Sequence, residues 1–460
     1  MNRTKGTEKR RTGRTGVPAR ISRLVCLLAI LTMLISPAAA ESFEGAWAVP
    51  EGYQVERVFM LSRHNIRSPL SDGESMLGKI VSGKWFAWSS ASGELSVRGG
   101  LLETSMGQFF RKWTEQTGLF PVNYQPDKAA VRVYANGYQR TQATARFFAA
   151  GLLPLADITV ECYAPLNAMD EIFKPRLRFC SDRYKADVMA QIAGLGGISG
   201  LDGLHAGQLD ALRLLMDVTG MKDNAVYQSG EYGDLLENDL EILLEEGSAP
   251  ETRGWLKTAT SVADAMIMQY YEEPDDLKAA FGHELTDDQW RMISGIVTTF
   301  GEVLYGVPLI AVNAAHPMLE TIRNELTANG RKFSFYCGHD ANLASVIGAL
   351  DTEEYTLPEA IETRTPVGAK LMFVRLTDEG GNAWYDVSLV YQSTRQMRGA
   401  EILDASNPPL KYPMRFKDVP VNEQGLIAES DLLKLLDEKI DALTLLKEEY
   451  TTEAAEEDAA

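Results

Sequence analysis

Three short apolar segments, far apart in the chain, each end at a turn that carries charged or imidazole side chains. They are residues 58–61, 131–134 and 333–337. The turns after the second and third segments lead into stretches with apolar residues at helical spacing. A strand that passes through a turn into a helix is the repeating unit of α/β proteins, whose parallel strands gather ligand-binding groups at one edge of the sheet. This repeated unit predicts an α/β fold built on a mainly parallel sheet.

The first turn, residues 63–69, places two guanidinium groups around one imidazole at a strand end. Its sequence is Arg-His-Asn-Ile-Arg-Ser-Pro, so the imidazole is that of His64 and the cations are Arg63 and Arg67. Arginine binds phosphate oxygens through a planar fork, and an imidazole nitrogen can donate a proton or attack phosphorus. Taken alone, such a string is more often a solvated basic turn. Its interpretation therefore depends on partners elsewhere in the chain.

The third turn supplies a partner, because the buried strand 333–337 ends at Gly338 and delivers His339 and Asp340. An apolar helix face follows, formed by Leu343, Val346, Ile347 and Leu350. This spacing places Asp340 at or near a helix N-cap. Capping is the simplest role for Asp340. Its pairing with His339, at a helix start that attracts anions, favours a role in an active site instead.

The second turn adds another cation, Arg140, between the strand 131–134 and a helix that carries Phe147 and Phe148. The chain has only five histidines, and two of them lie at these strand ends. The other three lack such surroundings, and we interpret them as structural or surface residues. They are His205, His283 and His316.

The combined motifs resemble the histidine acid phosphatase family, a branch of the phosphoglycerate-mutase-like superfamily. The similarity extends to residues 98–100, 134–141, 338–344, 365–368 and 387–392, and so covers most of the chain after the first 40 residues. The resemblance implies a histidine phosphatase fold, in which a mainly parallel central sheet is flanked by helices and carries an inserted, mostly α-helical lid.

The resemblance also implies roles for the residues at the strand ends. His64 would attack phosphorus and form a phosphohistidine, and Asp340 would protonate the leaving oxygen. The other four would bind the phosphate: Arg63, Arg67, Arg140 and His339. Because Asp340 must be neutral in the first step and a carboxyl ionises near pH 4, we expect activity to favour acidic pH. Arginines would balance the phosphate charge, so the scheme requires no metal and no cofactor.

Asn65 stands where most members of the family have glycine, and this variant resembles the bacterial periplasmic glucose-1-phosphatase subgroup. Residues 269–272, Gln-Tyr-Tyr-Glu, also resemble a substrate-contacting segment of that subgroup. Glu272 is therefore a candidate for holding sugar hydroxyls. An acidic helix end without a binding role is an equally good interpretation of Glu272, because further acidic residues follow it in the sequence.

The first 40 residues read as a secretory signal peptide with cleavage after Ala40. A basic stretch is followed by an apolar run, residues 24–35, that is shorter than the about 20 residues of a typical membrane-spanning helix. These features predict a periplasmic or secreted protein. Removal of this segment, with eight Lys or Arg and one Glu, would change the net charge from −19 to −26. Such a charge disfavours nucleic acid and anionic membranes as partners, and leaves a small phosphomonoester as the expected one.

Three cysteines follow the signal peptide. Cys162 and Cys180 flank a short proline-containing loop, and an exported protein could join them by a disulfide, an alternative that the sequence leaves open. Cys337 lies in the predicted buried strand beside the third turn, where it serves as a small apolar side chain.

The remaining chain of roughly 420 residues is long enough for two domains, one of them split by an insertion. Residues 101–113 show the apolar face of a helix that covers a sheet, whereas residues 235–244 and 262–271 predict helices of the insertion. Residues 370–376 and 384–391 alternate in character and predict the more peripheral strands. The expected parts are a signal peptide (1–40), the first part of the α/β domain (41–155), a helical lid (156–306), the second part of the α/β domain (307–428), and a C-terminal helix with an acidic tail (429–460). The tail, from Glu448, is predicted to be disordered.

These observations favour a phosphomonoesterase that acts on sugar phosphates of the glucose 1-phosphate type, with phytate as a further substrate. Glutamates in the insertion favour smaller and less charged substrates. A phosphomutase of the same superfamily is a second reading, disfavoured by the export signal and by the pair of His339 and Asp340. A non-catalytic phosphate-binding module is the third, although binding alone would require neither the His64 nucleophile nor a proton donor.

Overall fold

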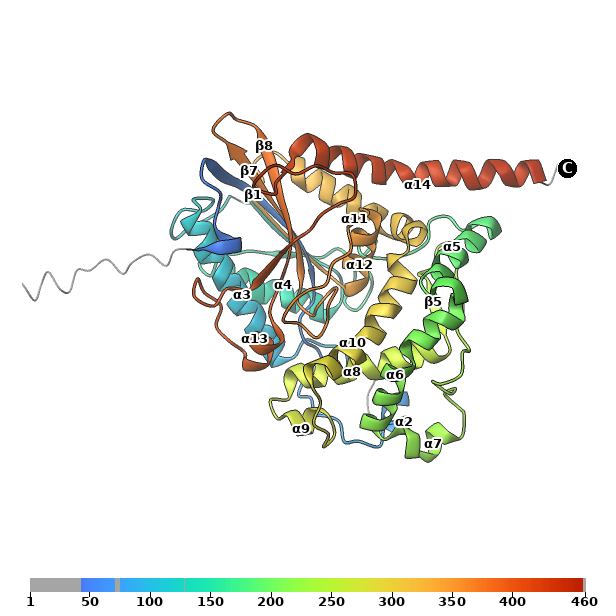
Figure 1. Ribbon diagram of the computed structural model, residues 1–460. Coiled ribbons are helices and arrows are strands. Elements are labelled where there is room, and N and C mark those ends of the chain that lie inside the picture. The colour runs from blue at the N-terminus through green and yellow to red at the C-terminus, as the bar shows by residue number, and fades with distance from the viewer. Residues whose placement is uncertain (1–42, 71–74, 128, 458–460) are drawn as a thin grey trace, which may run out of the picture. The chain divides into compact units, whose positions relative to one another are not determined.

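The structure, a computed structural model, describes residues 43–70, 75–127 and 129–457 (Figure 1). Within these residues, the main sheet has eight strands in the order β10-β8-β7-β1-β6-β2-β3, and β9 pairs with β8. The strands are β1 (Tyr53–Arg63), β2 (Val131–Ala135), β3 (Val160–Glu161), β6 (Phe333–Gly338), β7 (Lys370–Asp378), β8 (Ala383–Tyr391), β9 (Leu410–Pro413) and β10 (Ile427–Ala428). The three apolar segments, residues 58–61, 131–134 and 333–337, therefore lie in β1, β2 and β6.

The centre of the sheet is parallel, because β6 lies between β1 and β2 and runs parallel to both. The predicted α/β class with helices around a parallel core is confirmed, although the complete sheet is mixed. Strand β7 pairs antiparallel with β1 on one side and with β8 on the other. Its prediction as a peripheral strand is wrong. The four consecutive residues 371–374 are all buried, as expected for a strand covered on both faces rather than one that alternates.

Helices cover both faces of the sheet, and alternate residues of β1 show why. Val58 and Met60 pack with helices α3 (Val97–Gln116) and α4 (Gln139–Leu152), whereas Phe59 and Leu61 face the opposite side. Covering that opposite side are α11 (Pro308–Thr327), α12 (Asp340–Ala349) and α14 (Glu429–Glu457). The predicted helix of residues 101–113 lies within α3, and its expected core residues are buried.

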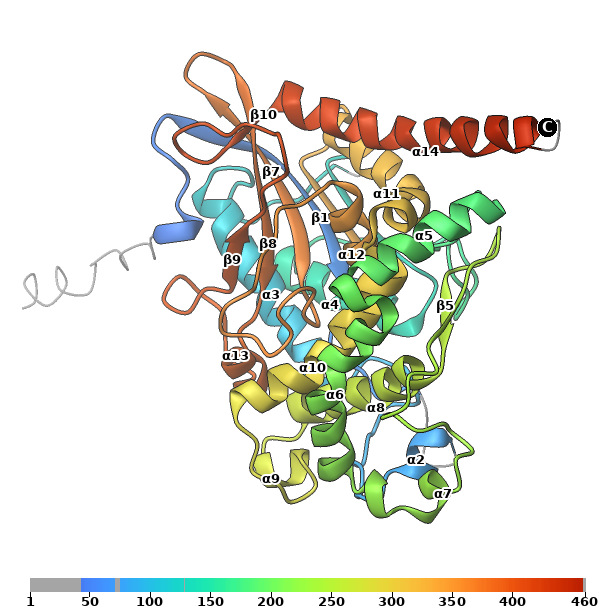
Figure 2. The same cartoon turned by 45° about the vertical axis from the view of Figure 1, so that its right-hand side comes forward.

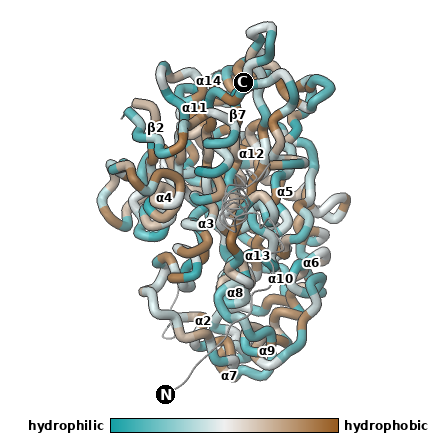
Figure 3. The backbone as a smooth tube through the Cα atoms, turned by 90° about the vertical axis from the view of Figure 1, so that its left-hand side faces the viewer, coloured by the Kyte–Doolittle hydropathy of each residue, from teal (hydrophilic) through white to brown (hydrophobic). Residues whose placement is uncertain are grey.

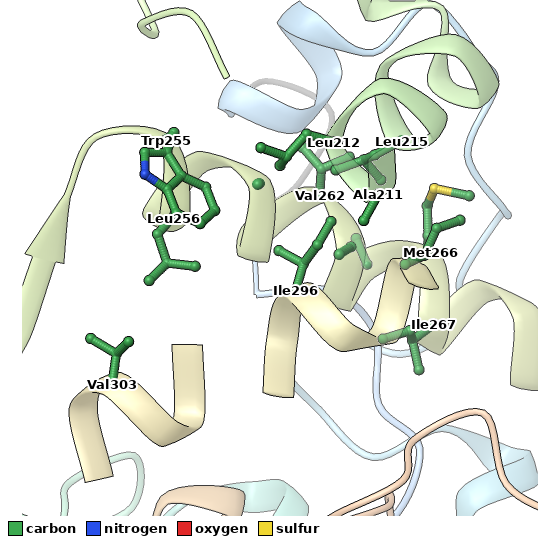
Figure 4. Packing of buried hydrophobic residues seen from close by; sticks show 14 of the residues in the cluster. Ala211, Leu212, Leu215, Trp255, Leu256, Val262, Met266, Ile267, Ile296 and Val303 are labelled. Atoms are coloured by element: carbon green, nitrogen blue, oxygen red, sulfur yellow. The ribbon is translucent and has the colours of Figure 1, made fainter. Parts of the chain in front are cut away.

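A second group of helices forms its own core beside the sheet (Figure 2). Its members are α2 (Met76–Ile80), α5 (Asp182–Gly194), α6 (Gly200–Thr219), α7 (Ala225–Gln228), α8 (Trp255–Glu272), α9 (Asp276–Ala279) and α10 (Asp287–Gly301). Leu212 and Leu215 of α6 pack near Val262 and Met266 of α8 and Ile296 of α10 (Figure 4). The predicted helix of residues 262–271 is confirmed within α8. Along such helices the chain alternates between hydrophobic and hydrophilic segments, as amphipathic helices do (Figure 3).

The predicted helix of residues 235–244 is wrong. Strand β4 (Glu241–Leu243) lies in this stretch and pairs antiparallel with β5 (Glu251–Arg253). Leu235 and Leu244 are both buried in the helical core, yet they reach it from non-helical chain. Apolar residues at helical spacing were thus placed by tertiary packing and not by a local helix.

The C-terminal segment is one long helix. Helix α14 runs from Glu429 to Glu457, so the prediction of a disordered tail from Glu448 is wrong for residues 448–457. Tyr450 is buried and its hydroxyl donates to Asp187 of α5, 2.8 Å away. This contact attaches the far end of α14 to the helical region (Figure 2).

The predicted signal peptide, residues 1–40, lies outside the described residues. Within the described part of the chain, no single helix is long and apolar enough to cross a membrane, and the segments Asp287–Gly306 and Pro308–Thr327 pass that test only together, across a bend of 77°. Cys162, Cys180 and Cys337 are free thiols in the structure, so the disulfide that the sequence left open is not formed.

Candidate active site

The carboxyl ends of β1, β6 and β2 bring the predicted site residues together. Arg63 is in register with Gly338, and Ala135 is in register with Cys337, so the turns that follow these strands lie side by side. All six strand-end residues line one cavity of about 910 Å³. They are Arg63, His64, Arg67, Arg140, His339 and Asp340. Helix α12 begins at this edge, so its N-terminal end also points toward an incoming anion.

His64 is oriented by its own loop. Its Nδ1 lies 2.9 Å from the carbonyl oxygen of Asn65, and a carbonyl can only accept, so Nδ1 carries the proton and Nε2 keeps its lone pair. Burial lowers the pKa of His64 well below the usual range, and the charges of Arg140, Arg67 and Arg63 lower it further. The ring is therefore a neutral nitrogen nucleophile even in mildly acidic solution.

His339 is held in the complementary orientation. The Oδ1 atom of Asn136 accepts from the backbone N–H groups of Gly137 and Asp170, so its Nδ2 is the atom that faces His339 Nε2, at 2.7 Å. Nε2 consequently accepts, and the proton of the neutral ring lies on Nδ1. Burial and then Arg140 lower the pKa of His339 to about 3. Nδ1 lies 3.5 Å from Arg140 Nη2, and two donors at this distance can share one phosphate oxygen.

Three arginines of the cavity each leave one buried donor without a protein partner. The Nε atoms of Arg63, Arg67 and Arg140 make no hydrogen bond within the described residues. A buried unsatisfied donor is costly in a folded protein and calls for a partner such as a bound anion. Burial also lowers the pKa of Arg140 to about 10, helped by the nearby charge of Arg67. The site therefore has unsatisfied positive charge.

Acidic side chains hold two of these arginines in place. Arg63 donates to Glu362 at 2.7 Å and to the carbonyl of Thr365 at 2.6 Å, and Arg67 pairs with Asp264 at 2.8 Å. Burial alone would lower the pKa of Arg63, but Glu362 and Asp340 raise it, so the guanidinium stays charged. These contacts orient the guanidinium groups before any ligand binds.

Asp340 is the first residue of α12 and lies beside Arg63. Its Oδ2 is 3.7 Å from Arg63 Nη2, and its Oδ1 accepts from the N–H of Ala341. Burial alone would raise the pKa of Asp340, but Arg63, His339 and the Ala341 N–H together lower it. The side chain is nevertheless 48% exposed, so it is accessible from the cavity.

Glu272 is not among the residues that line this cavity. It is the last residue of α8, and its Oε2 accepts from the hydroxyl of Ser96, the N-cap of α3, at 2.7 Å. Asp264 lies two turns earlier on the same helix and does reach the cavity. The glutamates that favoured smaller and less charged substrates in the prediction are also absent from the described residues that line the cavity. These glutamates are Glu237, Glu241, Glu245 and Glu246.

Sequence reasoning missed Asp264, Glu362 and Asn136. The signal for Asp264 was a polar stripe on the otherwise apolar α8, formed by Lys257, Thr260, Ser261 and Asp264 at the spacing of one helix face, all of which line the cavity. Asn136 directly follows β2, in the same position as the other site residues. Glu362 lies in an irregular segment and had no local signal.

The other chemistry-bearing residues have structural surroundings. His205 donates from Nε2 to the carbonyl of Leu235, 3.0 Å away, and packs against Trp255. Cys337 is buried in β6, and burial raises the pKa of its thiol well above the usual range. No group of three or more His, Cys, Asp or Glu side chains in the described chain is arranged to hold a metal ion.

Known proteins are similar to this chain in sequence and in fold. The family model of the histidine phosphatase superfamily (branch 2) matches residues 54–176. A glucose-1-phosphatase of Salmonella typhimurium is 34% identical over 386 residues, which cover 83% of this chain and 91% of that protein. Phytase AppA of Escherichia coli is 26% identical over 432 residues, or 90% of this chain and 97% of that protein. The solved structure of Hafnia alvei phytase shares the fold, with a TM-score of 0.77, 24% identity and coverage of 86% of this chain and 99% of that one.

The similarity to the glucose-1-phosphatase extends over most of both chains. The family predicted from the motifs is thereby confirmed, and the chain belongs to the histidine phosphatase superfamily, branch 2.

Proposed function

We propose that the chain is a phosphomonoesterase that hydrolyses small sugar phosphates through a phosphohistidine on His64. The observation that carries this proposal is the state of the His64 ring. A neutral imidazole, with Nδ1 bonded to Asn65 and Nε2 free, lies among three arginines whose buried Nε donors are each unsatisfied within the described residues. A module that only binds phosphate would need the arginines but not a nucleophile kept neutral among them.

The phosphate group would bind at the arginines. Arg63, Arg67 and Arg140 neutralise the non-bridging oxygens, and the Nδ1–H group of His339 donates to one of them. Because Arg63, Arg67 and His339 are already oriented by Glu362, Asp264 and Asn136 respectively, little reorganisation of these donors is needed when charge shifts in the transition state. The charge on the oxygens, which would otherwise repel the nucleophile, is then balanced.

The reaction would proceed in two steps. His64 Nε2 forms a bond to phosphorus while the bond from phosphorus to the ester oxygen breaks, and that oxygen takes the proton of Asp340. Water then attacks the phosphohistidine and gives a proton to the Asp340 carboxylate, which releases phosphate and restores His64. In the free enzyme Arg63 helps to lower the pKa of Asp340. A bound phosphate offsets the charge of Arg63, and this raises the Asp340 pKa when the proton is needed.

The charges around the cavity favour a substrate with a single phosphate. Seven acidic and seven basic side chains line the cavity. Positive charge is concentrated at the strand ends, in Arg63, Arg67 and Arg140, and acidic side chains in the rest of the cavity balance it. Phytate carries further phosphate groups that would meet the acidic residues. Relatives of this chain include both glucose-1-phosphatases and a phytase, and we therefore propose glucose 1-phosphate as the better substrate and phytate as a poorer one.

Turnover of p-nitrophenyl phosphate in the presence of EDTA tests the proposed reaction. His64→Ala should abolish turnover, and alkaline quenching of Asp340→Asn during turnover should trap a phosphorylated peptide that contains His64, since a phosphohistidine is hydrolysed in acid but survives in base. His205→Gln is the matched control, because this histidine lies outside the cavity. Full turnover by His64→Ala would overturn the proposal.

A second comparison tests the substrate. The value of kcat/KM should decrease in the order glucose 1-phosphate, glucose 6-phosphate, phytate. A mutase would instead convert one glucose phosphate into the other without release of inorganic phosphate. A higher kcat/KM for phytate than for glucose 1-phosphate would overturn the substrate assignment while leaving the phosphatase reaction intact.

We also propose export of the protein, on the basis of residues 1–40, with small phosphate esters and not nucleic acid or membrane as its partners. Expression of the full chain, followed by fractionation and N-terminal sequencing of the product, tests this. Recovery of the intact chain in the cytoplasm would contradict it.

A further inference from the structure

A buried ion pair that the proposed reaction does not use lies beneath the His64 loop. Lys370 Nζ and Glu103 Oε1 are 2.7 Å apart, and both side chains are completely inaccessible to solvent. Lys370 is the first residue of β7, and Glu103 belongs to α3, so the pair joins the sheet to a covering helix. Removing two charges from water is costly, and a buried ion pair often stabilises a protein no more than well-packed apolar residues do. Stability alone therefore does not account for this pair.

The contacts of the pair lead to Asn65 and, through Gly368, to the backbone carbonyl of His64 itself. Asn65 Nδ2 donates to Glu103 Oε1 at 3.4 Å, on the same oxygen that accepts from Lys370. Lys370 also donates to the carbonyl of Gly368 at 2.7 Å, and the N–H of Gly368 donates to the carbonyl of His64 at 3.1 Å. The ion pair is thus connected to the peptide groups on which the position of the His64 ring depends.

Asn65 has little freedom to move. Its Oδ1 accepts from the N–H of Ile66 at 2.8 Å, and its own N–H donates to the hydroxyl of Thr144 at 3.1 Å. Gly368 packs closely against it. A Cβ atom at Gly368 would lie 2.7 Å from Asn65 Nδ2, and the φ of +73° at Gly368 also favours glycine. The Asn65 carbonyl, which accepts from His64 Nδ1, is consequently fixed in direction.

We propose that Asn65, Glu103 and Lys370 are positioning residues that hold His64 as the Nδ1–H tautomer with Nε2 available for attack. The proposal rests on the function assigned above to His64. Loss of the Asn65 anchor would let its peptide rotate, and the ring could then carry its proton on Nε2. A proton on Nε2 removes the lone pair that attacks phosphorus, and so lowers the rate of phosphoryl transfer without weakening the binding of phosphate by the arginines.

Two variants of the complete chain test this inference. Asn65→Ala removes the anchor without leaving a buried charge, and the double variant Glu103→Leu with Lys370→Met replaces the pair by apolar side chains of similar size. In both, kcat for p-nitrophenyl phosphate should fall at least tenfold while KM stays within twofold. The control replaces a second ion pair of the same sheet, outside the cavity, by Lys411→Met with Asp386→Leu, and should keep the wild-type kcat.

The ¹⁵N chemical shifts of His64 give a direct reading of the tautomer. The wild type should show a protonated Nδ1 and an unprotonated Nε2 at pH 7, whereas the two variants should show a mixture of tautomers. A folded double variant with wild-type kcat and wild-type shifts would overturn the inference, as would an Asn65→Ala variant with higher KM and unchanged kcat. If the double variant does not fold, the kcat, KM and ¹⁵N shifts of Asn65→Ala alone decide whether the inference holds.

The two readouts separate this inference from the proposed function. The ¹⁵N shifts require no turnover. A wild-type protein without phosphatase activity, whose His64 nevertheless changes tautomer in Asn65→Ala, would reject the function and retain the positioning contact. An active wild type with unchanged shifts and rates in the variants would reject only the positioning role.

Discussion

The guanidinium of Arg67 and the carboxylate of Asp264 lie 2.8 Å apart inside the cavity, so the site already holds an internal anion before phosphate enters. Arg67 comes from the loop after β1, and Asp264 comes from α8 in the separate helical region. The pair therefore connects the two groups of elements at the phosphate site. It orients Arg67, but its negative charge also opposes an incoming anion.

Replacement of this anion should strengthen the binding of phosphate. We expect Asp264→Asn to lower the inhibition constant of inorganic phosphate about tenfold, equivalent to about 1.4 kcal/mol, because the amide retains a hydrogen bond to Arg67 without its charge. The ratio of kcat/KM for phytate to that for glucose 1-phosphate should rise as well. Asp276→Asn is the control, since Asp276 pairs with Arg398 and does not line the cavity. An unchanged or higher inhibition constant in Asp264→Asn would contradict this role.

The pH dependence of activity follows from the lowered pKa values of the two histidines. Burial and nearby arginines lower the pKa of His64 well below its usual range and that of His339 to about 3. The rate should therefore not fall between about pH 7.5 and about pH 5.5, where an ordinary imidazole takes up a proton. The protonated fraction of Asp340 rises as the pH falls, and kcat with an alkyl phosphate should therefore increase toward acidic pH. Rapid-mixing rates across this range provide the measurement, and Asp340→Asn should remove the increase. A loss of rate with a midpoint near pH 6.5 would be evidence against a neutral His64.

Two adjacent phenylalanines of α4 offer a matched test of the sheet packing. Phe148 is fully buried and stacks on Phe335 of β6 with ring centroids 4.1 Å apart, whereas Phe147 is 44% exposed. Phe148→Ala should reduce the free energy of unfolding by about 3–5 kcal/mol, because it leaves a cavity beneath the central strand. Phe147→Ala should change it by about 0.5 kcal/mol or less. Urea titrations followed by circular dichroism can measure both, and equal losses would show that α4 does not pack as described.

Tyr450 should keep the end of α14 attached to α5. Its hydroxyl donates to Asp187, and its ring lies 5.0 Å from the guanidinium of Arg183. In Tyr450→Ala, backbone amides of residues 445–451 should exchange with deuterium about tenfold faster, since fewer contacts oppose local opening. Leu445→Ala, at an exposed position of the same helix, should leave the exchange rates unchanged. Equal exchange in both variants would argue against this attachment.

Local patterns in the sequence were sufficient to predict the elements that carry the site. The apolar runs of β1, β2 and β6 end at Arg63, His64, Arg140, His339 and Asp340, and a parallel sheet necessarily brings such ends to one edge. The motifs at the ends of these strands also predicted the family. Side-chain periodicity also predicted the buried face of α3, because a single helix presents it without help from distant residues.

Distant contacts decided the rest. Glu272 and Asp264 lie on one helix, yet only Asp264 reaches the cavity, because the position of α8 against the sheet determines which turn faces the site. Residues 235–244 have helical spacing but meet the core from a turn and a short strand. Residues 448–451 are too acidic to predict order but continue a helix that Tyr450 attaches to α5. The sequence alone therefore determined the strand ends and their chemistry. The orientation of Arg63 and Arg67 by acidic partners depended on tertiary packing, because residues separated by hundreds of positions leave no local pattern.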